Sequence, residues 1–194
     1  MSLYILVWMS LAVADPVERA EYVRLSTEIQ SLSERNAWSG VERAYAAAMA
    51  TSHPMSHRDH VAGAMAAGAR GDAATTRLRL QAAHRLREDR KIVEWLWALD
   101  TRYGSVELRA QPGTVLLATE RTFDPSHGRA VLFAAQSLTQ AGSFAGLLPV
   151  GVYSLGEMEF EVLSGPSRLE VIGAPEKVRS RRRPGRVERV MLLP

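Results

Sequence analysis

The chain has 194 residues, of which 46% are hydrophobic and 23% are charged, and it contains no cysteine. These proportions are typical of a globular protein, so they exclude a wholly disordered chain and a disulfide-stabilised scaffold. No run reaches the roughly 18 apolar residues that a membrane-spanning helix needs, so no transmembrane span is expected. The length allows one domain or two small ones.

The net charge of +3 comes from one region of the chain. Residues 174–194 contain seven Lys or Arg and two Glu, a local charge of +5, which leaves −2 on the rest. The cluster around the predicted Pro184-Gly185 turn consists of Arg179, Arg181, Arg182, Arg183 and Arg186. Such arginines either form a solvated loop or bind the phosphates of a polyanion or an anionic lipid. Nucleic acid is not the expected partner, because no aromatic residues lie between the arginines to stack on bases.

The first 14 residues resemble a secretory signal peptide. Leu3 to Leu11 is an almost wholly apolar run, and the small residues Ala12-Val13-Ala14 follow it as at a cleavage site. The run is short and no Lys or Arg precedes it, which departs from the usual pattern. We expect residues 1–14 to be a signal peptide and the protein to be periplasmic or secreted. The alternative is an apolar N-terminal element that packs on the fold.

Residues 15–103 are predicted to form an α-helical domain. Apolar residues at helical spacing predict a first helix from Pro16 with Tyr22, Leu25 and Ile29 on one face. Further helices are expected over 39–50, 57–69, from Gly71-Asp72 to residue 86, and 90–99. Ser56 and Asp59 have the spacing of a capping box that would start the third of these five helices.

Two helix pairs repeat at an offset of 35 residues. The first set, Trp38, Val41, Tyr45 and Ala48, aligns with Ala73, Thr76, Leu80 and Ala83. A helix–turn–helix unit of about 34 residues is the period of tetratricopeptide repeats. Residues 19–87 therefore resemble two degenerate repeats of that family, with residues 91–99 as a capping helix. Thr76 and a missing proline depart from the family pattern, and a plain bundle of helical hairpins is the alternative.

Residues 104–194 are predicted to form a β-rich domain with a basic C-terminal hairpin or tail. Alternation over 105–110, a short apolar run at 114–118 and the intervening Pro112-Gly113 predict a hairpin from Val106 to Leu117. An amphipathic helix is expected over 125–141, and further strands over 158–163, 168–172 and 186–193. The predicted fold class is α+β: helical hairpin repeats followed by a small β-sandwich-like domain with one inserted helix.

A second resemblance lies in the β-rich half. The stretch Gly142-x-Phe144-x-Gly146-x-Leu148-Pro149-x-Gly151-x-Tyr153 is similar to the small prealbumin-like and PEGA-type β-domains of bacterial surface proteins. The resemblance covers about residues 104–173, and the inserted helix departs from it. It implies a non-catalytic stalk or adhesion surface.

No pattern of reactive residues predicts catalysis, a metal site or a bound cofactor. Pro54 is expected to place His53 outside the third helix, which leaves His57 and His60 as two ligands, fewer than a metal site needs. Three carboxylates alternate along a predicted strand and are expected to face solvent: Glu157, Glu159 and Glu161. Phosphate-binding loops, nucleophile elbows and dinucleotide-binding motifs do not occur in the sequence.

These features favour a non-catalytic, exported scaffold or protein–protein interaction module of the bacterial cell envelope. A groove in the helical repeats would receive a protein or peptide partner. Tyr22, Trp38 and Tyr45 are the candidate partner-binding residues, with core packing as their alternative role. A cationic protein that binds polyanions through Arg181–Arg186 is the first alternative function. A hydrolase with an unrecognised site is the second.

Overall fold

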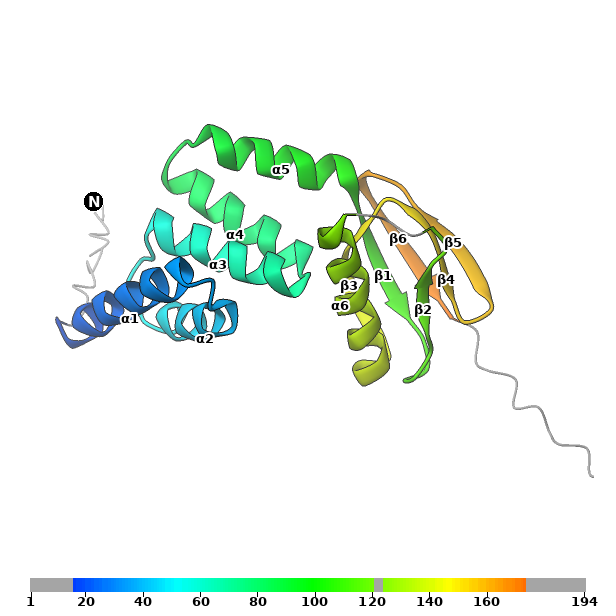
Figure 1. The fold of residues 1–194 in the computed structure, drawn as a ribbon, viewed down its shortest axis with the longest axis horizontal. Helices are drawn as coiled ribbons and strands as arrows, with labels where there is room; N and C mark the ends of the chain where they lie inside the picture. Colours follow the sequence, from blue (N-terminus) through cyan, green and yellow to red (C-terminus); the bar gives the residue numbers. More distant parts are fainter. Residues whose placement is uncertain (1–15, 121–123, 174–194) are drawn as a thin grey trace, which may run out of the picture.

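The structure is a computed structural model that describes residues 16–120 and 124–173. Five helices come first, two three-stranded sheets follow, and a sixth helix lies between the two parts (Figure 1). The α+β fold class is therefore confirmed. The expected signal peptide, the arginine cluster at 179–186 and the expected strand at 186–193 lie outside the described residues.

The helical half consists of helices that pack against their neighbours in the chain, and the first also packs against the third. They are α1 (Pro16–Glu34), α2 (Trp38–Met49), α3 (His57–Arg70), α4 (Ala73–Leu86) and α5 (Arg90–Arg102). Helices α2 and α4 begin at positions 38 and 73, which have the 35-residue offset of the sequence repeat. Tyr45 and Ala48 in α2 are buried, as are the aligned residues Leu80 and Ala83 in α4, whereas Val41 is buried and its counterpart Thr76 is only partly buried. The internal repeat thus corresponds to two helices that bury equivalent positions.

A buried carboxylate joins α1 to α3. Asp59 is fully buried and completes the predicted capping box with Ser56 at the start of α3. Its carboxylate also accepts hydrogen bonds from Tyr22 Oη at 2.7 Å, Ser26 Oγ at 2.9 Å and Gln30 Nε2 at 2.9 Å. These donors are four residues apart along α1, so they form one polar stripe on that helix. Burial raises the pKa of Asp59, but the hydrogen bonds it accepts outweigh burial and hold the pKa below 3.8.

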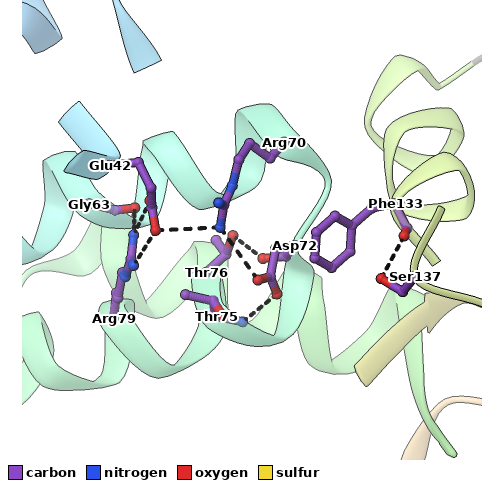
Figure 2. A network of polar contacts seen from close by, with 9 residues as sticks. All are labelled: Glu42, Gly63, Arg70, Asp72, Thr75, Thr76, Arg79, Phe133 and Ser137. Atoms are coloured by element: carbon purple, nitrogen blue, oxygen red, sulfur yellow. Dashed lines mark hydrogen bonds and ion pairs between the residues drawn. The ribbon is translucent and has the colours of Figure 1, made fainter. Parts of the chain in front are cut away.

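A bidentate ion pair joins α2 to α4 in the same half. Arg79 Nη1 and Nη2 donate to the two carboxylate oxygens of Glu42 at 2.6 and 2.8 Å, and Nη1 also donates to the Gly63 carbonyl at 2.7 Å (Figure 2). The guanidinium carbon lies 4.0 Å from the centre of the Tyr45 ring. Arg70 approaches Glu42 from the other side at 3.4 Å. The planar guanidinium group of Arg79 therefore joins α4, to which it belongs, to both α2 and α3.

Arg79→Lys is expected to destabilise the fold by about 1–2 kcal/mol, because lysine supplies neither the bidentate pair nor the planar stacking surface. Arg77→Lys is the matched control. Its partner Asp100 receives one hydrogen bond at 2.7 Å and both side chains are more than a third exposed, so a change below about 0.5 kcal/mol is expected. Urea unfolding of both variants checks the prediction, and equal losses would contradict it.

The β-rich half contains two three-stranded sheets. The first has the order β3 (Ser143–Pro149), β1 (Tyr103–Arg109), β6 (Gly165–Ile172), and the second has the order β2 (Leu116–Ala118), β4 (Gly151–Leu155), β5 (Met158–Val162). Strand β1 runs antiparallel to β3 and parallel to β6. Both sheets and α6 (Pro125–Ala141) contribute to one core, in which Leu108, Leu138 and Leu155 are almost completely buried.

The predicted hairpin from Val106 to Leu117 is wrong. Strands β1 and β2 belong to different sheets, because β1 pairs on both sides with strands that are distant in the sequence, while β2 pairs with β4. The Pro112-Gly113 turn therefore connects two sheets. The stretch from Phe144 to Tyr153 also divides between sheets, at Val150, whose N–H donates to the Arg102 carbonyl at 2.9 Å.

The two halves meet where the turn between α3 and α4 touches α6. Gly71 ends α3 with φ of +87°, and a Cβ at this position would lie 2.2 Å from the carbonyl oxygen of Arg129 in α6. Next to it, Ala73, Tyr103 and Ala130 form a small buried cluster. Helix α5 runs directly into β1, and Figure 1 shows it spanning from the helical half to the sheets. The junction is therefore a packed contact as well as a covalent one.

Candidate functional site

A groove of about 600 Å³ lies between α1, α3 and the N-terminal part of α5. We call it the α5 groove. Its lining comprises Gln30 and Ser33 from α1; His57, Arg58, Val61, Ala62 and Met65 from α3; and Arg87, Asp89, Lys91, Ile92, Glu94 and Trp95 in or next to α5. Alternate helices of the helical half thus form its walls, and α2 and α4 contribute none of these lining residues.

The apolar part of the α5 groove contains two large side chains that remain accessible. Met65 is 38% exposed and Trp95 is 46% exposed. Ile92 is buried beside them against Leu80 and Ala83. An accessible methionine and tryptophan on a rigid helical frame provide an adaptable contact and an aromatic anchor, which are both enriched at binding surfaces.

Some charged side chains of the α5 groove form ion pairs with each other or with a neighbouring residue, and others do not. Asp89 is 3.4 Å from Arg87 and accepts from the Lys91 backbone N–H, which caps α5, and Glu94 pairs with Arg90. Within residues 16–120 and 124–173, Arg58 and Lys91 form no ion pair. The groove therefore presents two cations whose charge is available to a partner.

His57 lines the same groove with a neutral ring. Burial lowers its pKa from 6.5, and the nearby Arg87 and Arg58 lower it further against the opposing effect of Asp89. Among the described residues, neither ring nitrogen has a hydrogen-bond partner. At neutral pH this histidine therefore offers the groove two ring nitrogens for hydrogen bonding and adds no positive charge.

A second cavity of about 490 Å³ lies where the helical half meets α6, and we call it the junction pocket. Its apolar lining includes Trp38, Met65, Leu80, Trp95, Ala98 and Leu99. Its polar lining includes Arg102, Tyr103, Ser126, His127 and Arg129, and none of the residues that line it is an aspartate or a glutamate. Met65 and Trp95 line both cavities, so these two side chains separate the α5 groove from the junction pocket.

The structure places the three predicted partner-binding aromatics away from the α5 groove. Tyr22 and Tyr45 are buried, and their hydroxyls bond Asp59 and His60 Nδ1 respectively. Trp38 is partly buried and lines the junction pocket. Sequence reasoning missed Met65 and Trp95. For Trp95 a signal was present, because Ile92, Leu96 and Leu99 already account for the packed face of α5.

The residues that the sequence offered for catalysis or metal binding do not come together at one site. His53 lies outside α3, as Pro54 predicted, and Glu157, Glu159 and Glu161 are exposed. Among the described residues, no group of three His, Asp or Glu side chains is placed to hold a metal ion. Ser126 and His127 follow Asp124, but the Ser126 hydroxyl donates to the Asp124 carboxylate at 2.6 Å and belongs to the cap of α6.

Comparisons with protein-family models, curated proteins and solved structures find no match to this chain. Among the described residues, no helix is both long and apolar enough to cross a membrane. The two cavities and the side chains that line them are therefore the features from which a function can be inferred.

Proposed function

We propose that the protein is a non-catalytic interaction module whose α5 groove binds an amphipathic, acidic segment of a partner protein. The observation that carries the proposal is the α5 groove itself, in which accessible Met65 and Trp95 lie beside Arg58 and Lys91, two cations that form no ion pair with any residue the structure describes. Such a surface matches a peptide with apolar anchors and neighbouring carboxylates. The internal helical repeat supports this proposal, since stacked helical hairpins generally bind partners along such a groove.

The charge part of the proposal predicts a large loss of binding on charge reversal. Arg58→Glu/Lys91→Glu should weaken binding of a short, fluorescein-labelled amphipathic peptide with Glu at its polar positions by about tenfold or more. The measurement is fluorescence anisotropy at two salt concentrations, since the contribution of these charges should fall as salt rises.

The control double variant is Arg19→Glu/Arg43→Glu, which reverses two exposed charges outside the groove and should leave the affinity close to that of the native chain. A counterpart peptide with Lys in place of Glu should bind weakly. Equal losses in the two double variants, or equal binding of the two peptides, would contradict the proposal.

The apolar part of the proposal rests on Trp95. Trp95→Ala should weaken the acidic peptide by about tenfold or more, because truncating an aromatic anchor at the centre of an interface has effects of this size. Trp97→Ala is the matched control, since Trp97 is 67% exposed on the same helix and does not line the groove. If both substitutions had the same effect on affinity, the α5 groove would not be the binding site.

The proposed compartment is the periplasm or the cell exterior, and it rests on residues 1–14 alone. N-terminal sequencing of the protein recovered from its native compartment should give a chain that begins at Asp15. A chain recovered with Met1 in place would contradict export. Polyanion binding through Arg181–Arg186 stays a prediction, because those residues lie outside the described ones, and hydrolysis stays a prediction as well.

A further inference from the structure

The apolar lining of the junction pocket comes mostly from α2 to α5, and its charged and polar lining comes mostly from the end of α5 and the start of α6, which we call the body and the polar end. Trp38, Leu80, Trp95 and Leu99 provide much of the body, while Arg102 and Arg129 belong to the end near α6. The volume of about 490 Å³ lies within the range of roughly 300–1,000 Å³ that is usual for small-molecule sites. An apolar body with a few polar groups at one end is the arrangement such sites share.

The positive charge at the polar end comes from two independent elements. Arg102 ends α5, whereas Arg129 lies in the second turn of α6. Burial raises the pKa of the Tyr103 phenol and the hydrogen bond with Ser126 opposes that increase, while Asp124 raises the pKa further and the charges of Arg129 and Arg102 lower it. Both arginines line the junction pocket together with Tyr103.

The remaining charged and titratable groups leave this end positive. Asp124 is the neighbouring carboxylate, 4.0 Å from Arg102 and 3.7 Å from His127, and its oxygens also cap α6 through Ser126. The ring of His127 packs edge-on against Tyr103 with the ring centres 5.5 Å apart. Asp124 is thus shared by Arg102, His127 and the cap of α6, and Arg129 forms no ion pair within the described residues, so the two guanidinium groups leave a positive charge that favours an anion at this place.

We propose that the junction pocket binds a single-chain amphipathic anion, with its acyl or aromatic body among Trp38, Trp95 and Leu99 and its carboxylate or phosphate group between Arg102 and Arg129. The apolar surface stabilises the body of the ligand by burial. The two guanidinium groups form charge-assisted hydrogen bonds with the head group. A cationic or uncharged amphiphile gains only the first of these contributions, so the site discriminates by head-group charge.

The test uses the full chain with three soluble probes that share an alkyl body: decanoate, decanol and decyltrimethylammonium, all below their micelle-forming concentrations. Isothermal titration calorimetry should show decanoate binding to one site per chain and about tenfold more tightly than either other probe. Decyl phosphate should bind like decanoate, since the proposed contacts require only the anionic oxygens. Vesicles of an anionic phospholipid distinguish a membrane surface from a free amphiphile and should not bind the chain through this pocket.

Three variants locate the binding. Arg102→Gln/Arg129→Gln should weaken decanoate about tenfold while leaving decanol unchanged. Ala98→Leu should weaken all probes by filling the body of the pocket, with far-ultraviolet circular dichroism as the check that the variant is folded. Arg43→Gln, an exposed arginine outside the pocket, should change nothing.

The proposal is overturned if decanoate fails to bind, if decyltrimethylammonium binds equally well, or if the double arginine variant retains the affinity of the native chain. Binding only to vesicles would also overturn it, because that result assigns the arginines to a membrane surface. None of these four results bears on the proposal for the α5 groove, since Arg58 and Lys91 do not line the junction pocket.

Discussion

Gly71→Ala is expected to destabilise the protein by about 3 kcal/mol, combining about 1–2 kcal/mol for an L residue in the left-handed region with about 1–3 kcal/mol of overpacking. Gly71 has φ of +87°, and the added methyl group would lie 2.2 Å from the Arg129 carbonyl oxygen. Since that atom is backbone in α6, relief requires the two halves of the molecule to separate. Urea or thermal unfolding measures the loss.

Gly113→Ala separates the two causes. Gly113 has a nearly equal φ of +89°, but nothing lies within 4 Å of the position that its Cβ would occupy. This control should therefore lose only the conformational part, about 1 kcal/mol. Equal losses in the two variants would show that the close approach of α3 and α6 contributes nothing.

Asp59→Asn is expected to destabilise the protein by about 2–3 kcal/mol, because the amide nitrogen would face hydroxyl and amide donors in place of a carboxylate oxygen. Asp59 is fully buried and accepts hydrogen bonds from Tyr22, Ser26, Gln30 and Ser56. Glu161→Gln, an acid-to-amide change on an exposed side chain, is the control and should change the free energy of unfolding by less than about 0.5 kcal/mol.

The same carboxylate predicts a specific response to acid. Its pKa in the folded chain lies below the ordinary value of 3.8, so its stabilising contribution is present above about pH 4 and is lost as the pH falls through the lower, folded value. The difference in free energy of unfolding between the native chain and Asp59→Asn should therefore shrink below about pH 4. The measurement covers about pH 2 to 6, roughly two pH units either side of the ordinary pKa. If the difference in free energy of unfolding between the two proteins did not change over this range, Asp59 would not have this role.

The helical half was largely predictable because helices are encoded by local spacing. Apolar residues three and four apart located α1, α2 and α5, the Ser56–Asp59 capping box located α3, and Gly71-Asp72 marked the start of α4. The burial of Asp59 was not predicted, since a capping residue is ordinarily at the surface. The polar stripe of Tyr22, Ser26 and Gln30 on α1 was the available signal, and it indicated a buried polar partner on a neighbouring helix.

The β-rich half was predictable in most of its elements, except for β3 and β4, over which no separate strands were predicted, and it was not predictable in its pairing. Alternation located β1, β5 and β6, and Pro125 with Gly142 marked the ends of α6. Alternation does not say which strands pair, so the shortest connection suggested a hairpin across Pro112-Gly113. In the structure β1 pairs with β3 and β6, and these non-local contacts depend on how both sheets cover α6 and each other.

The candidate site depended on tertiary structure for the same reason. Conspicuous aromatics such as Tyr22 and Tyr45 were natural candidates, yet packing between helices buries both of them. Met65 and Trp95 come from helices that are separated by α4 in the sequence, and only the fold brings them together beside Arg58 and Lys91. Side-chain type alone therefore did not identify the residues that line the α5 groove.

Nuclear magnetic resonance of the methionine methyl groups and tryptophan indoles during titration with the acidic amphipathic peptide tests the central proposal most directly. Met65 and Trp95 line the α5 groove, whereas Met49 and Trp97 are more exposed and lie outside it, and Trp38 lines the junction pocket and not the groove. If the peptide binds in the α5 groove, the Met65 and Trp95 signals should shift while those of Met49, Trp97 and Trp38 do not. Shifts of Met49 or Trp97 with Met65 and Trp95 unmoved would contradict it.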